Sequence, residues 1–310
     1  MKIIIFKTGA LGDVLRTSYF AKYLRMTNRY TKIDWLTDKT ALPLIRHNPY
    51  IDTVYTQNTF SVSNYDRIYS LDDEKNIVEL TKGVPPENIT GAYFHKDQLT
   101  YTRDSADWFD MGLISELGKT TADAMKKTNT KSHIEIFENI FDVKKVRPNS
   151  NLNCQRDANK YRQVCITPAA GKRWPSKSLL EKELLKLIQL IANQGKSIKI
   201  VGTEVDFLQY NTAMQNFPDL FAIVDSIQEL SNEIYNSGTH ITADTLSLHI
   251  GQSLGKKMVS FFAPTSAAEI PSIQNIKICS TARDYCSYSA NANNETITAD
   301  RIYNALNHYI

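Results

Sequence analysis

The sequence alternates between short apolar runs and stretches whose apolar residues recur at helical spacing. The first run, residues 3–6, is entirely apolar, and Gly9 and Gly12 separate it from an amphipathic stretch that begins near Val14. A fully apolar strand, a glycine-containing turn and a helix are typical of a parallel α/β unit, because parallel strands are buried on both faces. The rhythm recurs along most of the chain and predicts doubly wound α/β architecture.

The expected elements form two sets. In the first set we expect strands at 33–36, 53–55, 67–69 and 91–94, and helices near 14–24, 40–46, 74–82 and 133–141. In the second set we expect strands at 164–166, 198–202, 221–224, 240–242 and 258–262, and helices at 178–193, 205–216, 227–235, 246–254 and 298–309. Residues 95–132 are polar and weakly periodic, which indicates helical fragments joined by loops. Residues 144–161 contain a proline and four asparagines, which is typical of a linker.

We therefore expect two Rossmann-like domains, residues 1–150 and 151–310, with a closing helix that could pack back on the N-terminal domain. The length of 310 residues fits two ordinary domains. The 36 Lys and Arg against 33 Asp and Glu leave a net charge of +3, without the concentrated basic excess of nucleic-acid-binding proteins. No apolar run approaches the roughly 18–20 residues of a membrane helix, and the N-terminal run is too short for a signal peptide. These features predict a cytoplasmic protein.

Cysteine spacing argues against a metal or disulfide framework. The four cysteines, Cys154, Cys165, Cys279 and Cys286, form no C-x-x-C pair and no ligand pattern with histidine. Reduced structural thiols are the expected state in a cytoplasmic protein.

The loop after the first strand, residues 8–13, invites comparison with phosphate-binding loops. It has neither G-x-G-x-x-G nor G-K-[ST], which argues against a nicotinamide oxidoreductase and a P-loop enzyme. Asp13 would also repel a pyrophosphate at the start of a helix. Two interpretations remain open: Asp13 caps the helix, or it is a general base that takes a proton from an acceptor hydroxyl.

Polar residues also follow four strands in the second half of the chain: Lys172 and Arg173, Glu204 and Asp206, Asp244 and Thr245, and Thr265. The cations could neutralise a phosphate or be solvated, and the acids could bind sugar hydroxyls or cap a helix. Thr245 and the helix amides that follow it could hold a diphosphate. His249 lies one turn further on the same face, where a buried structural histidine is the alternative.

Together these segments resemble glycosyltransferase family 9, the heptosyltransferases of lipopolysaccharide assembly. The family's L-G-D motif is matched by residues 11–13, and its K-x-W-P motif by residues 172–175. Its D-[ST]-G-x-x-H motif is matched by Asp244, Thr245 and His249, and its F-G-P-T turn by residues 262–265. The motifs occur in the family's order and span almost the whole chain.

The resemblance implies a GT-B fold, in which two Rossmann-like domains face a cleft. It also implies metal-independent, inverting transfer from a nucleotide sugar, usually ADP-heptose, onto a glycan or glycolipid acceptor of a bacterial surface. It makes Asp13 the base and Lys172 a contact to the donor phosphate, and it places Thr8, Gly9 and Gly12 in the loop beside the acceptor. The remaining donor contacts that it implies are Asp206 or Glu204, Asp244, Thr245, His249 and Thr265.

Two positions depart from the family pattern, because Leu246 and Ala263 stand where the family has glycine. These departures leave open the alternative that the protein is a non-catalytic module, which binds a nucleotide sugar without turning it over. A sugar-nucleotide epimerase on the same fold is a second alternative. If the acceptor is linked to a lipid, the small basic surplus could guide the protein to the anionic inner leaflet of the membrane.

Overall fold

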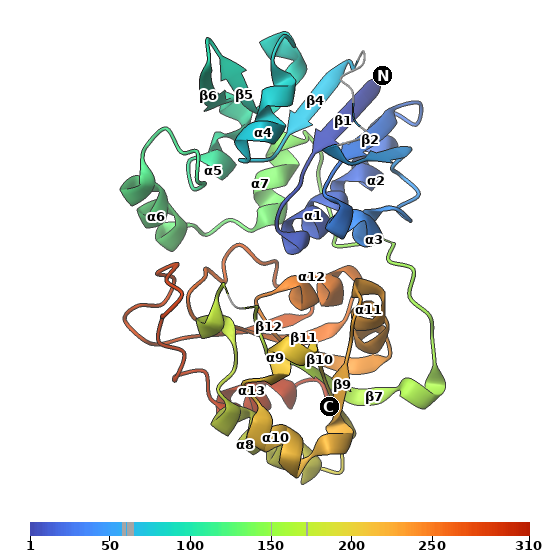
Figure 1. Ribbon diagram of the computed structural model, residues 1–310, viewed down its shortest axis with the longest axis vertical. Helices are drawn as coiled ribbons and strands as arrows, with labels where there is room; N and C mark the ends of the chain where they lie inside the picture. The colour runs from blue at the N-terminus through green and yellow to red at the C-terminus, as the bar shows by residue number, and fades with distance from the viewer. Residues whose placement is uncertain (58–59, 61–64, 150, 172) are drawn as a thin grey trace. The chain divides into compact units, whose positions relative to one another are not determined.

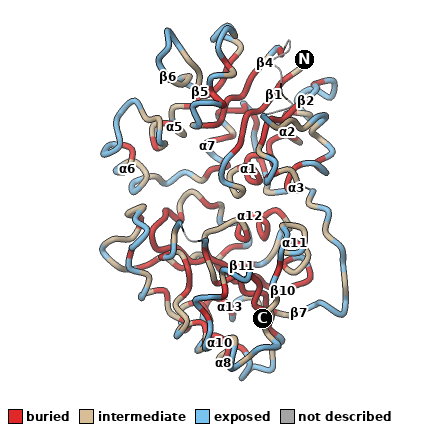
Figure 2. The backbone as a smooth tube through the Cα atoms, in the orientation of Figure 1, coloured by how far each residue is buried: buried red, intermediate tan, exposed pale blue. Residues whose placement is uncertain are grey.

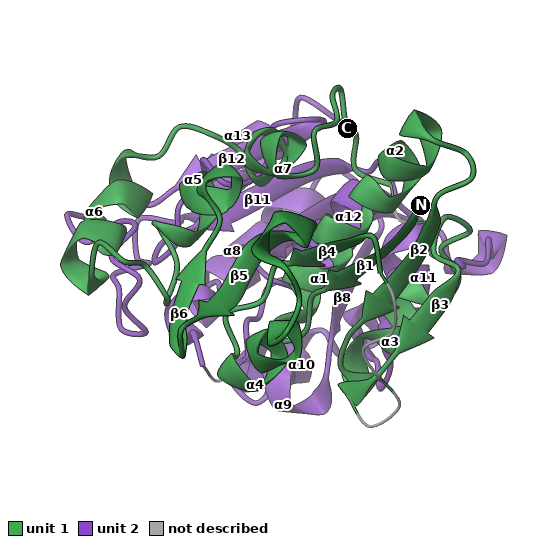
Figure 3. Ribbon diagram, turned by 90° about the horizontal axis from the view of Figure 1, so that it is seen from above, with its two compact units in different colours: residues 1–152 green, residues 153–310 purple. Residues whose placement is uncertain are grey.

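The computed structural model describes residues 1–57, 60, 65–149, 151–171 and 173–310. The chain divides into two compact units, Met1–Leu152 and Asn153–Ile310, which Figure 3 shows in green and purple. Each unit contains one six-stranded sheet with helices packed against it (Figure 1). The predicted doubly wound α/β architecture is confirmed.

Unit 1 contains a sheet of order β3-β2-β1-β4-β5-β6, in which all neighbours are parallel except β5 and β6. Its strands are β1 (Lys2–Phe6), β2 (Lys32–Leu36), β3 (Thr53–Tyr55), β4 (Arg67–Ser70), β5 (Ile89–His95) and β6 (Gln98–Tyr101). Its helices are α1 (Leu11–Ser18), α2 (Phe20–Thr27), α3 (Leu42–Ile45), α4 (Lys75–Val78), α5 (Ala106–Phe109), α6 (Lys119–Thr128) and α7 (His133–Ile140). The apolar run in β1 is fully buried, as a central parallel strand requires.

Unit 2 contains a wholly parallel sheet of order β12-β11-β10-β7-β8-β9. Its strands are β7 (Arg162–Thr167), β8 (Ile198–Gly202), β9 (Phe221–Ile223), β10 (Ser237–Ala243), β11 (Lys257–Phe262) and β12 (Asn275–Cys279). Its helices are α8 (Glu181–Ala192), α9 (Glu204–Phe207), α10 (Asn211–Asn216), α11 (Ile227–Tyr235), α12 (Leu246–Ser253) and α13 (Ala299–Leu306). Short 3₁₀ turns, among them Pro175–Lys177, complete both units.

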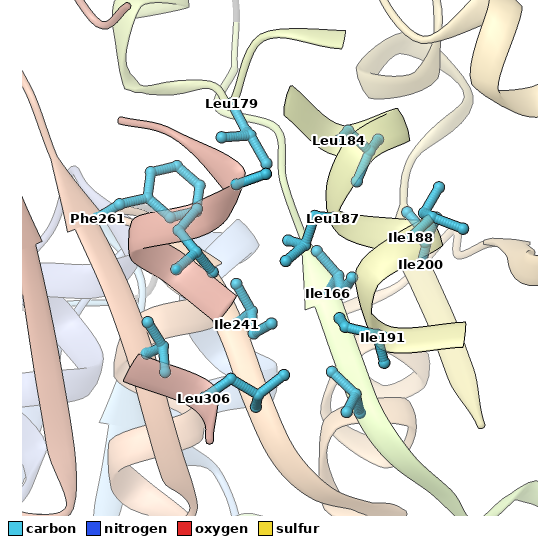
Figure 4. Packing of buried hydrophobic residues seen from close by; sticks show 14 of the residues in the cluster. Ile166, Leu179, Leu184, Leu187, Ile188, Ile191, Ile200, Ile241, Phe261 and Leu306 are labelled. Atoms are coloured by element: carbon cyan, nitrogen blue, oxygen red, sulfur yellow. The ribbon is translucent and has the colours of Figure 1, made fainter. Parts of the chain in front are cut away.

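The core of unit 2 shows why its helices cover the sheet as they do. The apolar face of α8 packs on strand residues such as Ile166 and Ile200, and Leu306 of α13 joins the same cluster (Figure 4). In Figure 2 the central strands β10 and β11 of this unit are largely buried. The closing helix α13 therefore buries its apolar face in the core of unit 2.

Three local predictions were wrong. Residues 98–101 form a strand instead of a helical fragment, because Lys96 and Asp97 both adopt positive φ and close a tight hairpin between β5 and β6. The edge strand β12 was missed, because it is short, includes Asn275 and Lys277, and has only two of its five residues buried. The helix expected over 205–216 is split into α9 and α10, because Tyr210 turns inward and its hydroxyl donates to the carbonyls of Pro168 and Leu179.

The strand order creates one topological switch point in each unit. In unit 1, the chain runs outward in opposite directions from the neighbours β1 and β4, and in unit 2 from β7 and β10. Ligands of open α/β sheets bind outside the carboxyl ends of the strands at such points, because the loops on either side diverge there. The turns after these four strands are therefore the places to look for a site.

Candidate functional site

A pocket of about 350 Å³ lies at the carboxyl ends of the strands of unit 2. Residues from the turns after β7, β8, β9 and β10 line it: Thr167, Ala169, Gly171, Val201, Gly202, Thr203, Val205, Asp206, Val224, Leu230, Thr245, Leu246 and Ser247. One part of this lining is aliphatic and another carries hydroxyls. A ligand with an apolar ring and a polar, hydrogen-bonding group would fit both parts.

Four hydroxyls meet beside the switch point of unit 2, and we call Thr167, Thr242, Thr245 and Ser247 the hydroxyl cluster. The Thr167 hydroxyl lies 2.9 Å from the hydroxyls of both Thr242 and Ser247. Ser247 in turn lies 2.7 Å from Thr242 and 2.8 Å from Thr245. Thr167, Thr245 and Ser247 line the pocket, so one wall of it is polar without carrying a formal charge.

Asp244 directly precedes Thr245, but its negative charge is balanced. Lys177 donates to the Asp244 carboxylate at 2.8 Å and to its backbone carbonyl at 3.0 Å, and the Thr265 hydroxyl donates to the same carboxylate at 2.6 Å. Burial opposes ionisation of Asp244, but Lys177, the hydrogen bond from Thr265 and nearby His249 outweigh it and lower its pKa to about 2. Lys177, Asp244 and Thr265 thus join three loops and leave the turn close to neutral.

Helix α12 begins at the pocket. Its N-cap is Thr245, whose side chain makes no capping hydrogen bond to the helix, and Leu246 is its first residue. Leu246 forms part of the pocket wall, and Ala263 is buried in the turn after β11. His249, in the second turn of α12, is 6% exposed and interacts electrostatically with Asp244. The sequence-predicted Asp244, Thr245, His249 and Thr265 therefore lie close together at the start of α12, with Thr265 contributed by the turn after β11.

The two acids after β8 have different surroundings. Asp206 lies in a capping box, in which its carboxylate accepts from the Thr203 amide at 3.0 Å and from the Thr203 hydroxyl at 2.7 Å. It also lines the pocket, whereas the side chain of Glu204 is exposed. Lys172 lies outside the described residues, and Arg173 is exposed.

The corresponding turn of unit 1, residues 7–10 after β1, is tied down by carboxylates. Buried Asp72, which follows β4, accepts from the Thr8 amide at 2.6 Å and from the Thr8 hydroxyl at 2.7 Å. Asp38, which follows β2, accepts from the amide of Gly9 at 3.1 Å. Gly9 has φ +72°, a conformation that glycine adopts without strain. These amides already hold anions, so they are poorly suited to bind a phosphate.

Asp13 lies in the first turn of α1 but does not cap it. The N-cap is Ala10, which has no side-chain cap, and Gly12 belongs to the helix itself. The Asp13 carboxylate pairs with the guanidinium of Arg16 at 3.0 Å, and the guanidinium lies 5.3 Å from the ring of Trp108. Asp13 is therefore not the N-cap residue of α1. The side chain of Asp13 remains 31% exposed, and its ion pair with Arg16 fixes the orientation of the carboxylate.

Several residues of these turns were not identified from the sequence. Lys177, Asp38, Asp72, Arg16 and Ser247 all bond to residues that were predicted. Asp38 and Asp72 could have been identified from the sequence, because each follows a predicted strand. Lys177 is a single cation in a 3₁₀ turn, and its partner Asp244 lies 67 residues away in the sequence. No local pattern reports such a pairing.

Two findings concern the described residues as a whole. No group of three or more His, Cys, Asp or Glu side chains among them is arranged to hold a metal ion. No helix in the same part of the chain is long and apolar enough to cross a bilayer.

Comparison with known proteins places the fold. No protein-family model matches the sequence, and a search of curated proteins finds no match. Among solved structures, E. coli heptosyltransferase WaaC with ADP is 14% identical, with a TM-score of 0.69 and complete coverage of both chains. A glycosyltransferase family 9 structure from Veillonella parvula is 13% identical, with a TM-score of 0.72, covering 99% of this chain and 96% of that one.

A UDP-GlcNAc 2-epimerase from Methanocaldococcus jannaschii is also similar but matches less well. It is 13% identical, with a TM-score of 0.50, covering 99% of this chain and 100% of that one. At these identities the likeness concerns the fold. The chain has the GT-B fold of the heptosyltransferase structures.

Proposed function

We propose that this protein is an inverting, metal-independent glycosyltransferase that moves heptose from ADP-heptose onto a glycan of lipopolysaccharide or a related bacterial surface glycan. The observation that carries the proposal is the contrast between the two switch points, within a fold similar over its whole length to heptosyltransferases. Unit 2 offers a pocket with an uncharged, hydroxyl-rich turn, and unit 1 offers a partly exposed carboxylate, Asp13.

The pocket of unit 2 suits a nucleotide. Aliphatic side chains such as Val201, Val224 and Leu230 can contact a base, and the polar wall at Thr245 and Ser247 can receive a diphosphate. The first amides of α12 add donors and the positive end of a helix dipole. Lys172 would add a cation to the leaving group. The structure of WaaC with ADP supports the choice of nucleotide.

The proposed reaction is a single in-line displacement. Asp13 accepts the proton of an acceptor hydroxyl as that oxygen forms a bond to the anomeric carbon. The bond from the anomeric carbon to the diphosphate oxygen breaks at the same time, and the nucleoside diphosphate leaves with the electron pair. The α12 amides, the hydroxyl cluster and Lys172 stabilise the charge that develops there, which is the work a divalent metal does in other enzymes.

A donor screen tests the proposal. Purified protein is incubated with ADP-heptose and a lipopolysaccharide that lacks heptose, with and without a chelator. We expect heptosyl transfer that the chelator does not reduce. ADP-, GDP-, UDP- and dTDP-hexoses serve as controls for the donor.

Other outcomes of that screen contradict the proposal in different ways. Transfer from UDP-sugars alone would overturn the donor, and loss of activity with chelator would overturn metal independence. Conversion of the donor without an acceptor would favour an epimerase. Binding without turnover for every donor would favour a non-catalytic module. A lipid-linked acceptor would place the reaction at the cytoplasmic face of the inner membrane.

A further inference from the structure

A buried histidine lies next to the hydroxyl cluster. His240, in β10, has none of its surface exposed, and its Nε2 lies 2.9 Å from the hydroxyl oxygen of Thr167. Burial lowers the pKa of this imidazole to about 3, and the charge of nearby Lys256 lowers it further. The ring is therefore neutral near pH 7, and only one of its two nitrogens carries a proton.

The surroundings of the other ring nitrogen indicate which one is protonated. Among the described residues, Nδ1 has no hydrogen-bond partner. A β-carbon built on Gly251 would lie 2.7 Å from Nδ1 and 2.9 Å from the Met258 sulfur, so α12 packs closely against this side of the ring. A buried N–H without an acceptor costs more than a buried lone pair without a donor. Nδ1 therefore holds the lone pair and Nε2 the proton.

The direction of the hydrogen bonds in the hydroxyl cluster depends on this tautomer. In the described part of the chain, the cluster's four hydroxyls make six close contacts, which include one to His240 and one from Thr242 to the Ala243 carbonyl. Four hydroxyl protons cannot fill six contacts, and a proton on Nε2 adds a fifth. With the proton on Nδ1, Thr167 would give its own proton to the ring. Since Thr242 donates to the Ala243 carbonyl, Ser247 could then accept a proton only from Thr245, and that proton would no longer be available to the pocket.

We propose that His240 is a positioning residue that orients the hydroxyl cluster toward an anionic ligand. The Nε2–H group donates to Thr167, Thr167 donates to Ser247, Ser247 donates to Thr245, and the Thr245 hydroxyl donates into the pocket. Each oxygen accepts one proton while it donates another, which strengthens the chain of bonds. The identity of the ligand, a nucleoside diphosphate, rests on the proposed function.

Two variants of similar shape isolate the donated proton. His240→Gln retains an N–H group close to the position of Nε2, and His240→Leu has none. ADP carries the diphosphate that Thr245 would contact, and adenosine lacks it. We expect His240→Leu to weaken ADP binding about tenfold, equivalent to about 1.4 kcal/mol, and to leave adenosine binding unchanged. His240→Gln should recover most of the affinity for ADP. Thr245→Val should weaken ADP binding as much as His240→Leu does, and the double variant should bind ADP no more weakly than either single variant.

A spectroscopic measurement tests the tautomer independently of any ligand. Nitrogen-15 NMR of the labelled wild-type protein shows which imidazole nitrogen of His240 carries the proton, and we expect Nε2. A proton on Nδ1 would overturn the proposal, as would equal losses for ADP and adenosine, or equal ADP affinity in the Gln and Leu variants. Failure of the wild-type protein to bind ADP would instead contradict the proposed donor.

Discussion

The turns at the two switch points have the same architecture and opposite electrostatics. In unit 1, the turn after β1 directs the Thr8 and Gly9 amides at the carboxylates of Asp72 and Asp38. In unit 2, the turn after β10 presents hydroxyls, and its one carboxylate, Asp244, is paired with Lys177. The parallel α/β topology therefore determines where a site lies. A few side chains after neighbouring strands determine whether that site can bind an anionic or a neutral ligand.

This difference assigns complementary chemistry to the two turns. Amides that already hold carboxylates cannot also bind phosphate, so unit 1 is suited to a neutral substrate with hydroxyl groups. A neutralised turn at the start of a helix is suited to an anion. The predictions below alter one side of this comparison at a time.

The largest expected effect belongs to Asp13. Asp13→Asn removes the proposed base but keeps the size of the side chain and its place in α1. We expect turnover to fall by about 10²- to 10⁴-fold, because proton transfer by a positioned side chain contributes that much. Donor binding, measured by calorimetry with ADP-heptose, should not change. Asp300→Asn, on α13, is the matched control, since Asp300 is an exposed acid paired with surface Lys186. Full turnover by Asp13→Asn would refute its role as base.

The next largest effect is expected when the turn after β10 in unit 2 is made anionic, like the turn after β1 in unit 1. Lys177→Met leaves the Asp244 carboxylate, only 12% exposed, without its cation. We expect a loss of about 3 kcal/mol in the free energy of unfolding, measured by urea denaturation, because a buried charge has lost its partner. Affinity for ADP should also fall, since the turn then repels the diphosphate.

Two further variants check the origin of that effect. Adding Asp244→Asn to Lys177→Met should restore much of the stability, because the unpaired charge is gone. Lys186→Met removes a cation whose partner, Asp300, is exposed, and we expect no measurable change. If Lys177→Met and Lys186→Met had equal effects, the Lys177 ion pair would not distinguish the two turns.

The sequence predicted the fold better than it predicted these charges. Periodicity finds β1 because burial on both faces demands continuous apolar residues, and Gly9 marks the turn that follows. It misses β6, whose hairpin uses Lys96 and Asp97 where glycine or asparagine is usual. The resemblance to a known family predicted Asp13 as a base and Asp244, Thr245, His249 and Thr265 as donor contacts, and the structure brings the last four close together. Lys177, Asp72 and His240 were not identified, because their partners are brought together only by the sheet.

The close approach of α12 to the sheet gives a smaller effect. A β-carbon on Gly251 would lie 2.7 Å from His240 Nδ1, so Gly251→Ala must push the helix or the ring aside. We expect a loss of about 2 kcal/mol in the free energy of unfolding, a typical cost of overpacking. ADP affinity should fall as well, because α12 carries Thr245 and Ser247. Gly171→Ala is the control for stability only, because its β-carbon would meet no atom within 4 Å but the residue lines the pocket. Equal stability of the two variants would contradict close packing as the support of the hydroxyl cluster.

The smallest expected effect is the pH dependence of the Asp244 ion pair. Its pKa is about 2 in the folded protein, against 3.8 for the ordinary carboxyl, because Lys177, Thr265 and His249 outweigh burial. A depressed folded-state pKa stabilises the protein fully above pH 4, and this contribution disappears as the pH falls toward 2. Unfolding free energies of wild type and Asp244→Asn, measured between pH 5 and 2, should therefore converge by about 1–2 kcal/mol on acidification. Asp300→Asn, compared in the same way, provides the baseline for an exposed acid. A difference between wild type and Asp244→Asn that stays constant over this range would mean that Asp244 is not held as a carboxylate. The contrast between the neutral turn of unit 2 and the anionic turn of unit 1 would then have to rest on the hydroxyl cluster alone.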